Sequence, residues 1–193
     1  MAIGFLIMLA AGTSVFAQNT NLPFHYLNIK GRTVETAHKL KLRVKVDRKY
    51  AFLAGTDYQP TFDGRQFNVS IAAFGHGDDF LMIHAEMHSD GSGGLDYSNL
   101  ARETLDEMMF SSKSDCAELD EAAIRGEHDL AFLNSNGFSP SPAIAIKQYF
   151  ATSSDGTSEV VITLGRRIKN CSVIEKAVFE RALQKPVKVS PLK

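Results

Sequence analysis

FNVSIAAFGHGDDFLMIHAEMH, residues Phe67–His88, is the stretch that decides the fold. Its two halves, Phe67–Phe74 and Phe80–His88, are rich in β-branched, aromatic and other apolar residues, which is typical of strands. The segment between them, Gly75–Asp79, holds two glycines, and glycine readily takes the positive φ that a tight turn requires. The stretch therefore predicts an antiparallel β-hairpin, the most strongly marked one in the chain.

Further strands are expected on both sides of this hairpin. Leu40–Val46 alternates apolar and basic residues without a break, which predicts a strand with one buried and one solvated face. Tyr50–Ala54 is apolar enough to form another strand. Ala143–Ala151 and Ser158–Leu164 are joined across an Asp-Gly dipeptide, which predicts a second hairpin. Six strands are expected in all.

Two central segments have the apolar spacing of amphipathic helices. The first begins at about Asp96. The residues near its apolar face are Leu100, Thr104, Leu105, Met108 and Met109. The second covers about Asp115–Asn134, and the dipeptide Asn136-Gly137 is a typical helix stop. Both helices are expected to pack on the sheet.

A third helix is expected near the C-terminus, where Val173–Ala182 has an apolar stripe that Pro186 ends. Val187–Lys193 then reads as a basic tail. Hairpins combined with helices predict a single α+β domain. Its antiparallel sheet would have about five or six strands, with roughly three helices packed on it and one disulfide.

The beginning of the chain is typical of an export signal. Gly4–Gly12 is a short apolar run, and Val15 and Ala17 are small enough for the subsites of a signal peptidase. We therefore expect residues 1–17 to be a signal peptide and 18–193 to be the domain, with a flexible stretch at its start. No Lys or Arg precedes the apolar run, so a buried first strand or helix is the alternative. Export would place the mature protein in the periplasm or outside the cell.

The two cysteines, Cys116 and Cys171, are expected to form a disulfide, because an exported chain matures in an oxidising compartment. Each cysteine precedes a helical pattern, so the bond would join two helix starts. Closing a loop of this length stabilises a fold by roughly 4 kcal/mol in the chain-entropy model. A redox-active or metal-binding pair is the alternative, but the spacing of such pairs is missing.

His84, Glu86 and His88 form the pattern with the most specific chemistry. Side chains two residues apart on a strand point to the same face, so two imidazoles and a carboxylate would lie together and could hold zinc or copper. Consecutive same-face side chains are almost 7 Å apart, roughly twice the strand rise, which is long for ligands of one ion. A solvated outer strand face is the alternative interpretation.

Charge is segregated along the chain although the net charge is only −1. Lys30–Lys49 carries eight basic and two acidic residues, whereas Asp78–Asp129 carries three basic and fourteen acidic ones. Lys41, Arg43 and Lys45 alternate along one strand and would form a basic row for an anionic partner, such as a protein or a component of the cell envelope. Ordinary solvated faces are the alternative. Nothing in the sequence predicts a nucleic-acid partner.

No hydrolase or nucleotide-binding motif is present, so the sequence favours binding over catalysis. The leading expectation is an exported, non-enzymatic binding or accessory protein that acts through its surface. The alternative is a metal-binding or metal-dependent protein built on the His-x-Glu-x-His strand. A third hypothesis is an enzyme whose site is assembled from residues distant in sequence.

Overall fold

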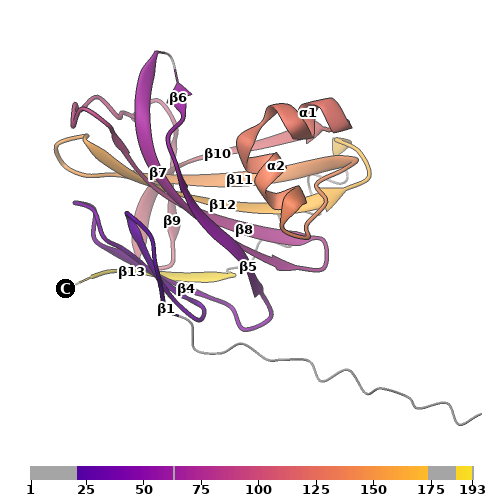
Figure 1. Cartoon of the computed structure of the whole chain (residues 1–193), viewed down its shortest axis with the longest axis horizontal. Helices are drawn as coiled ribbons and strands as arrows, with labels where there is room; N and C mark the ends of the chain where they lie inside the picture. Colours follow the sequence, from indigo (N-terminus) through magenta and orange to yellow (C-terminus); the bar gives the residue numbers. More distant parts are fainter. Residues whose placement is uncertain (1–20, 63, 174–185, 193) are drawn as a thin grey trace, which may run out of the picture.

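The computed structural model describes residues 21–62, 64–173 and 186–192, and this part of the chain is mostly β (Figure 1). Thirteen strands and two short helices lie within the described residues. The strands form two sheets in which every pairing is antiparallel.

The smaller sheet has five strands. In spatial order they are β1 (Asn21–Pro23), β2 (Leu27–Lys30), β3 (Thr33–Thr36), β4 (Leu42–Val46) and β13 (Val187–Pro191). The larger sheet has seven strands in a row, and the short strand β6 (Thr61–Phe62) pairs with one of them. In spatial order the seven are β5 (Ala51–Tyr58), β7 (Arg65–His76), β8 (Asp79–His88), β12 (Ser158–Ile168), β11 (Ala143–Thr152), β10 (Met108–Glu118) and β9 (Ala101–Leu105).

Both predicted hairpins are present at the centre of the larger sheet. In the β7–β8 hairpin His76 pairs with Asp79, so Gly77 and Asp78 alone form the loop, and Gly77 has a φ of 58°. A tight loop of this kind needs a left-handed residue, which glycine supplies without steric cost. The second hairpin joins β11 to β12, and β12 also pairs with β8, so the two hairpins form one continuous four-stranded core.

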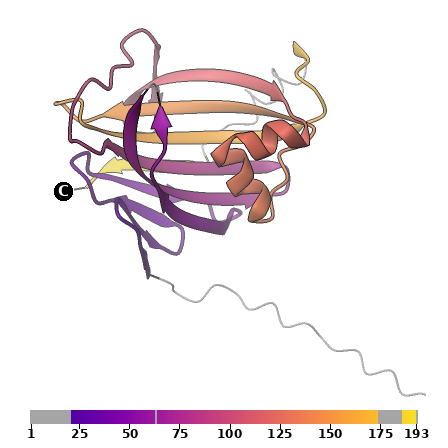
Figure 2. The ribbon, with the colours of Figure 1, turned by 45° about the horizontal axis from the view of Figure 1, so that its top comes forward.

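The larger sheet is covered on both faces. On β7, Ala72 and Phe74 point into a core shared with the smaller sheet, whereas Ile71 and Ala73 point into a core shared with the helices. The helix pair lies over one end of the larger sheet, with the smaller sheet on the other side (Figures 1 and 2). Each large apolar side chain buried in these cores contributes roughly 1.5–3 kcal/mol relative to an exposed one.

The predicted α+β class, with one sheet and three helices, is therefore wrong. The segment from Asp96 to Met109, expected as a helix, instead contains β9 and the start of β10. Leu105 pairs with Met108 around a two-residue loop, and Asp106 in that loop has a φ of 56°. Asp is among the few non-glycine residues that take this conformation readily. The apolar spacing of this segment fits a short hairpin as well as a helix.

The expected helix Asp115–Asn134 is wrong in its first part and interrupted in its second. Residues up to Glu118 belong to β10. Asp120 then caps α1 (Glu121–Gly126) by accepting a hydrogen bond from the backbone N–H of Ala123. The extended backbone of Glu127 separates α1 from α2 (His128–Ser135). The predicted stop is confirmed, because α2 ends before Asn136 and Gly137. Among the residues that the structure describes, no helix combines the length and the hydropathy needed to cross a membrane.

The C-terminal segment forms a strand where a tail was expected. Val187–Pro191 is β13, which pairs with β4 and completes the smaller sheet. The backbone N–H of Val189 donates to Asp106 of the β9–β10 loop at 3.1 Å, so the edge strand is tied to the larger sheet. The predicted signal peptide, residues 1–17, lies outside the described residues, and so does the predicted helix Val173–Ala182 apart from Val173 itself.

The predicted disulfide between Cys116 and Cys171 is confirmed, with a Cα–Cα distance of 5.8 Å. The expectation that it joins two helix starts is wrong for Cys116, which lies within β10. The bond connects β10 to the chain that follows β12. A disulfide of this kind indicates an oxidising environment outside the cytoplasm.

Gly165 offers a test of the packing between the larger sheet and the helices. Gly165 on β12 lies opposite Phe80 on β8, and a Cβ at this position would overlap the Phe80 ring. Phe80 is 1% exposed and its ring lies 5.0 Å from that of Phe138, so it has no room to move away. We expect Gly165→Ala to lower the free energy of unfolding by roughly 1–3 kcal/mol, measured by urea denaturation.

Gly126→Ala is the matched control, because nothing lies within 4 Å of a Cβ added there. Alanine favours helix over glycine, so this variant should be as stable as the parent or slightly more stable. Equal stability of Gly165→Ala and Gly126→Ala would show that the Phe80 ring is not held against β12.

Candidate functional site

A buried polar cluster lies on the helix-facing side of the larger sheet. His84 and Glu86 from β8 and Glu159 from β12 are 6%, 7% and 4% exposed. The register places Glu86 opposite Glu159, so their side chains share a face, and His84 is one position along the same face. The interpretation of this strand face as a solvated one is therefore wrong.

These side chains contact each other and two further groups. His84 Nδ1 lies 3.3 Å from Glu86 Oε1, and His84 Nε2 lies 3.5 Å from Asp129 Oδ2. Tyr97, in the loop before β9, donates its hydroxyl to Glu159 Oε2 at 2.6 Å. The cluster thus combines one imidazole with three carboxyl groups and a phenol, drawn from four separate segments.

The outer side of the cluster is formed by α2. Asp129 accepts a hydrogen bond from the Tyr58 hydroxyl at 3.2 Å. The Tyr58 ring stacks on His128, with ring centroids 3.7 Å apart and planes inclined by 11°. Because Tyr58 comes from β5, these contacts fix the start of α2 against the sheet. Asp129 is the part of the network that reaches water, since its side chain is 35% exposed.

Burial and charge shift the titration of two members of the cluster. Burial disfavours a charged His84, but the carboxylates of Asp129, Glu86 and Glu159 outweigh it and raise the pKa of His84 to about 9. Burial and the adjacent Glu86 raise the pKa of Glu159 to about 7, against the opposing effects of Tyr97 and His84. The cluster therefore holds a charged imidazole and a carboxyl that keeps its proton to unusually high pH.

The structure separates the three residues of the predicted zinc or copper site. His84 and Glu86 contact each other, whereas the Nδ1 atom of His88 lies 2.8 Å from the hydroxyl of Ser92. Within residues 21–62, 64–173 and 186–192, no three His, Cys, Asp or Glu side chains are grouped so that they could hold one metal ion. Metal binding stays a prediction, and elemental analysis of the parent and of the double variant His84→Ala/His88→Ala tests it.

The chemistry open to the cluster follows from its burial. A group that acts on a substrate must contact it, and His84, Glu86 and Glu159 are almost fully excluded from solvent. In this conformation the contacts of the cluster are internal. Paired buried carboxyl and imidazole groups fix the position of β8, β12 and α2 relative to each other, because leaving any one of them unpaired would be costly.

The predicted basic row lies on the outer face of the smaller sheet. Its three members differ: Lys45 is exposed, Arg43 is paired with Glu35 through a 2.7 Å contact, and Lys41 donates to the backbone oxygen of Ala37 at 2.9 Å. Lys45 makes no ion pair with any described residue. Of the predicted row, Lys45 is thus the cation left for a partner.

The sheet register adds two lysines to Lys45. Lys30 pairs with Thr33, Thr33 pairs with Lys45, and Lys45 pairs with Lys188. Cross-strand partners share a face, so Lys30, Lys45 and Lys188, which we call the lysine row, lie in one line across the sheet, with Thr33 between Lys30 and Lys45. All three are exposed. Lys188 was missed because its segment reads as a tail, and Lys30 because pairing cannot be deduced from one strand alone.

Nothing in the sequence indicates the partners of His84 in the buried cluster. Glu159 directly precedes the mostly apolar run Val160–Leu164, and Asp129 follows His128 in an acidic helical segment. Both patterns are common at solvated positions, so only the fold shows that these two residues belong to a buried cluster.

Comparison of the chain with protein-family models, with curated proteins and with solved structures found no match to any of them.

Glu159→Gln tests the electrostatics of the cluster. The pKa of Glu159 is about 7 in the folded protein and ordinarily 4.5, so its contribution to stability is present below pH 4.5 and is lost as the pH rises through 7. A glutamine cannot ionise and still accepts the Tyr97 hydrogen bond. We therefore expect the variant to be more stable than the parent at pH 8, by roughly 1–3 kcal/mol, and similar to it at pH 4.

The measurement is urea denaturation of both proteins at the two pH values. Glu107→Gln is the control, because it makes the same change at an exposed carboxylate in the β9–β10 loop. Its stability relative to the parent should not depend on pH. If the difference in stability between Glu159→Gln and the parent were also independent of pH, the Glu159 carboxyl would not have the raised pKa that its surroundings indicate.

Proposed function

We propose that this chain is an exported, non-enzymatic binding protein, periplasmic or secreted, that binds an anionic partner through the outer face of its smaller sheet. The observation that carries the proposal is the alignment of Lys30, Lys45 and Lys188, from β2, β4 and β13, on one face of that sheet. The disulfide supports the export part of the proposal, because such bonds persist in oxidising compartments.

The lysine row is presented by a rigid support. Each of its strands turns its alternate residues inward, and Ile29, Val44 and Val189 are at most 1% exposed in the core between the sheets. The ammonium groups therefore project from a packed layer and cannot fold back into it. Adjacent strands are ~4.8 Å apart, so Lys45 and Lys188 are immediate neighbours, and Lys30 lies two strands from Lys45. The row therefore offers several cations to a partner with repeated negative charges.

The charges of the row are available to a partner. None of the three lysines forms an ion pair with a described residue, whereas Arg43, on the same face, is neutralised by Glu35. The whole chain has a net charge of only −1, so attraction for an anion must come from a local cluster. Such attraction is screened by salt over a distance of about 8–10 Å at ordinary ionic strength.

The partner that fits this surface is an acidic protein or an anionic component of the cell envelope. A flat row of ammonium groups attracts negative charge without enclosing it, which suits a polymer or a surface more than a small molecule. Binding is favoured over catalysis because the strongly interacting acid and base groups, His84, Glu86 and Glu159, are turned inward and covered by the helices.

Reversal of the lysine row tests the proposal. We expect the triple variant Lys30→Glu/Lys45→Glu/Lys188→Glu to bind dextran sulfate, a polyanion, on the order of tenfold more weakly than the parent, since each exposed ion pair contributes about 0.2–1 kcal/mol. The affinity of the parent should fall steeply between 50 and 300 mM salt, roughly the range over which screening strengthens. The dissociation constants would be measured by fluorescence anisotropy with labelled polymer.

The matched control carries the same change of net charge elsewhere. Arg65→Glu/Lys113→Glu/Arg125→Glu alters exposed residues of the larger sheet and of α1. It should retain most of the affinity and the salt dependence of the parent. Equal losses in the two triple variants would mean that net charge alone governs binding, and the lysine row would have no special part in it.

A further inference from the structure

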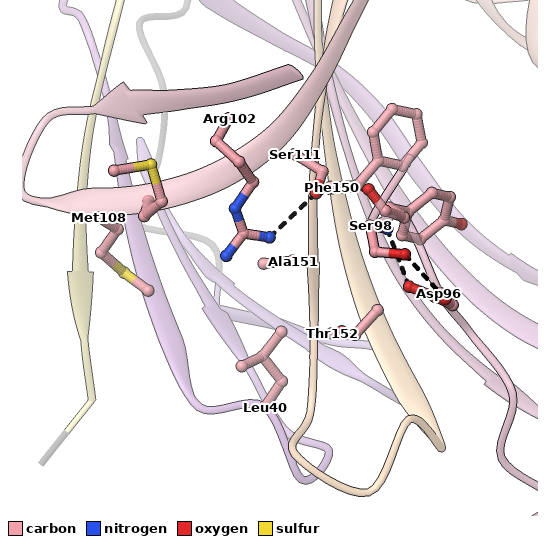
Figure 3. Close-up of a pocket in the computed structure, with 11 residues that line it drawn as sticks. Leu40, Asp96, Ser98, Arg102, Met108, Ser111, Phe150, Ala151 and Thr152 are labelled. Carbon is pink, nitrogen blue, oxygen red and sulfur yellow. Dashed lines mark hydrogen bonds between the residues drawn. The ribbon is translucent and has the colours of Figure 1, made fainter. Parts of the chain in front are cut away.

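A cavity of about 240 Å³ opens beside the β9–β10 hairpin. Its other walls come from the loop that precedes β9, from the end of β11, and from Leu40 before β4 (Figure 3). None of the lysine row takes part in it. Binding sites for drug-sized molecules measure roughly 300–1,000 Å³, so this cavity suits a smaller ligand.

The guanidinium of Arg102 is the cationic group of the cavity. Its Nη1 donates to the hydroxyl of Ser111 at 3.2 Å, and that hydroxyl in turn donates to the backbone oxygen of Tyr97 at 3.0 Å. Ser111 is 2% exposed, so the guanidinium is anchored to a fixed point. Figure 3 shows it between Met108 and Ser111, with Ala151 beside it.

Arg102 has hydrogen-bond donors that no described residue uses. An arginine side chain carries five N–H donors in a planar fork, and no described residue forms an ion pair with Arg102. Other arginines of the same sheet do have acidic partners: Arg166 binds Asp79 through two hydrogen bonds, and Arg167 binds Asp78. Arg102 differs from these two arginines because its fork lines a cavity and has no acidic partner among the described residues.

The carboxylates of Asp96 and Glu103 already have other partners. Asp96, which lines the cavity, accepts from the backbone N–H of Ser98 at 2.8 Å and from its hydroxyl at 3.1 Å. Glu103, next to Arg102 on β9, binds Lys147 at 2.6 Å. Neither carboxylate neutralises the guanidinium, so an external anion would complete its hydrogen bonding.

The cavity wall also has an apolar part beside its polar groups. Leu40, Met108, Met109, Phe150 and Ala151 contribute carbon and thioether surface to it. Met109 is 54% exposed, which is high for a large apolar side chain. Methionines adapt their shape to a bound apolar group, and the Phe150 ring is held in place by stacking on Tyr97 with centroids 4.5 Å apart.

We propose that this cavity binds a small organic carboxylate with a short apolar chain. The planar fork of Arg102 receives the carboxylate, because two parallel N–H groups match its two oxygens. The chain lies against Leu40 and the two methionines. This ligand class pairs the cation of the cavity wall with an anion and places a short chain against the apolar part of the wall.

Hexanoate and 1-hexanol test the carboxylate contact and the apolar contact separately, because they have the same alkyl chain and differ in charge. Calorimetric titration of the full chain should show hexanoate binding more tightly than 1-hexanol. Arg102→Gln should weaken hexanoate binding at least tenfold and leave 1-hexanol binding unchanged. Shortening the ligand from hexanoate to butanoate should weaken binding by roughly three- to fourfold for each methylene removed.

Arg48→Gln is the matched control, because Arg48 is an exposed arginine in the loop after β4 and does not line the cavity. It should bind hexanoate as the parent does. Circular dichroism would verify that the variants fold. Absence of hexanoate binding to the parent, or equal weakening in Arg102→Gln and Arg48→Gln, would overturn the proposal. Polyanion binding by the lysine row would be unaffected by either result.

Discussion

The central strands of the larger sheet have no solvated face, and the rest of the molecule is arranged to satisfy that constraint. Val69–Phe74 of β7 is buried without interruption, as are the central residues of β8 and β12. A sheet that is apolar on both sides needs a layer on each. The smaller sheet supplies one and the helix pair supplies the other, which is why α1 and α2, too short to be stable alone, persist where they pack. The polar residues of β8 are enclosed as a consequence of this layering.

The parts of the fold that local chemistry determines could be predicted from the sequence. Both central hairpins are marked by glycine at the turn and by β-rich runs on either side, and the cysteines could pair only with each other. Asp96–Met109 could not be assigned in the same way, because its apolar residues fit a helix and a two-residue hairpin equally well, and the left-handed Asp106 is not distinctive in sequence. The candidate sites were harder still. That His84 and Glu86 share a face follows from alternation, but Glu159, Asp129 and Tyr97 join them through pairings between distant segments.

Charged groups occupy two contrasting environments in this structure. The lysine row projects into solvent from the smaller sheet, where its charges are unpaired and their fields are limited by salt. The acids around His84 lie under the helices, where burial strengthens their mutual repulsion and the imidazole compensates it. Tyr97 lies at the boundary between this interior and the outside. Its ring forms part of the wall of the Arg102 cavity, and its hydroxyl is bound to Glu159.

The pairing of β13 with β4 has a consequence for how the protein must assemble. The first four strands of the smaller sheet precede the whole of the larger sheet in the chain, but the edge of β4 is closed by Val187–Pro191, which follows the larger sheet. Contacts between segments so far apart form slowly, because a large loop has to close before they bring any gain. Until Val187–Pro191 has been made and has paired, β4 keeps an open edge that other chains could join. A polypeptide built in this way profits from staying unfolded until β13 has been synthesised.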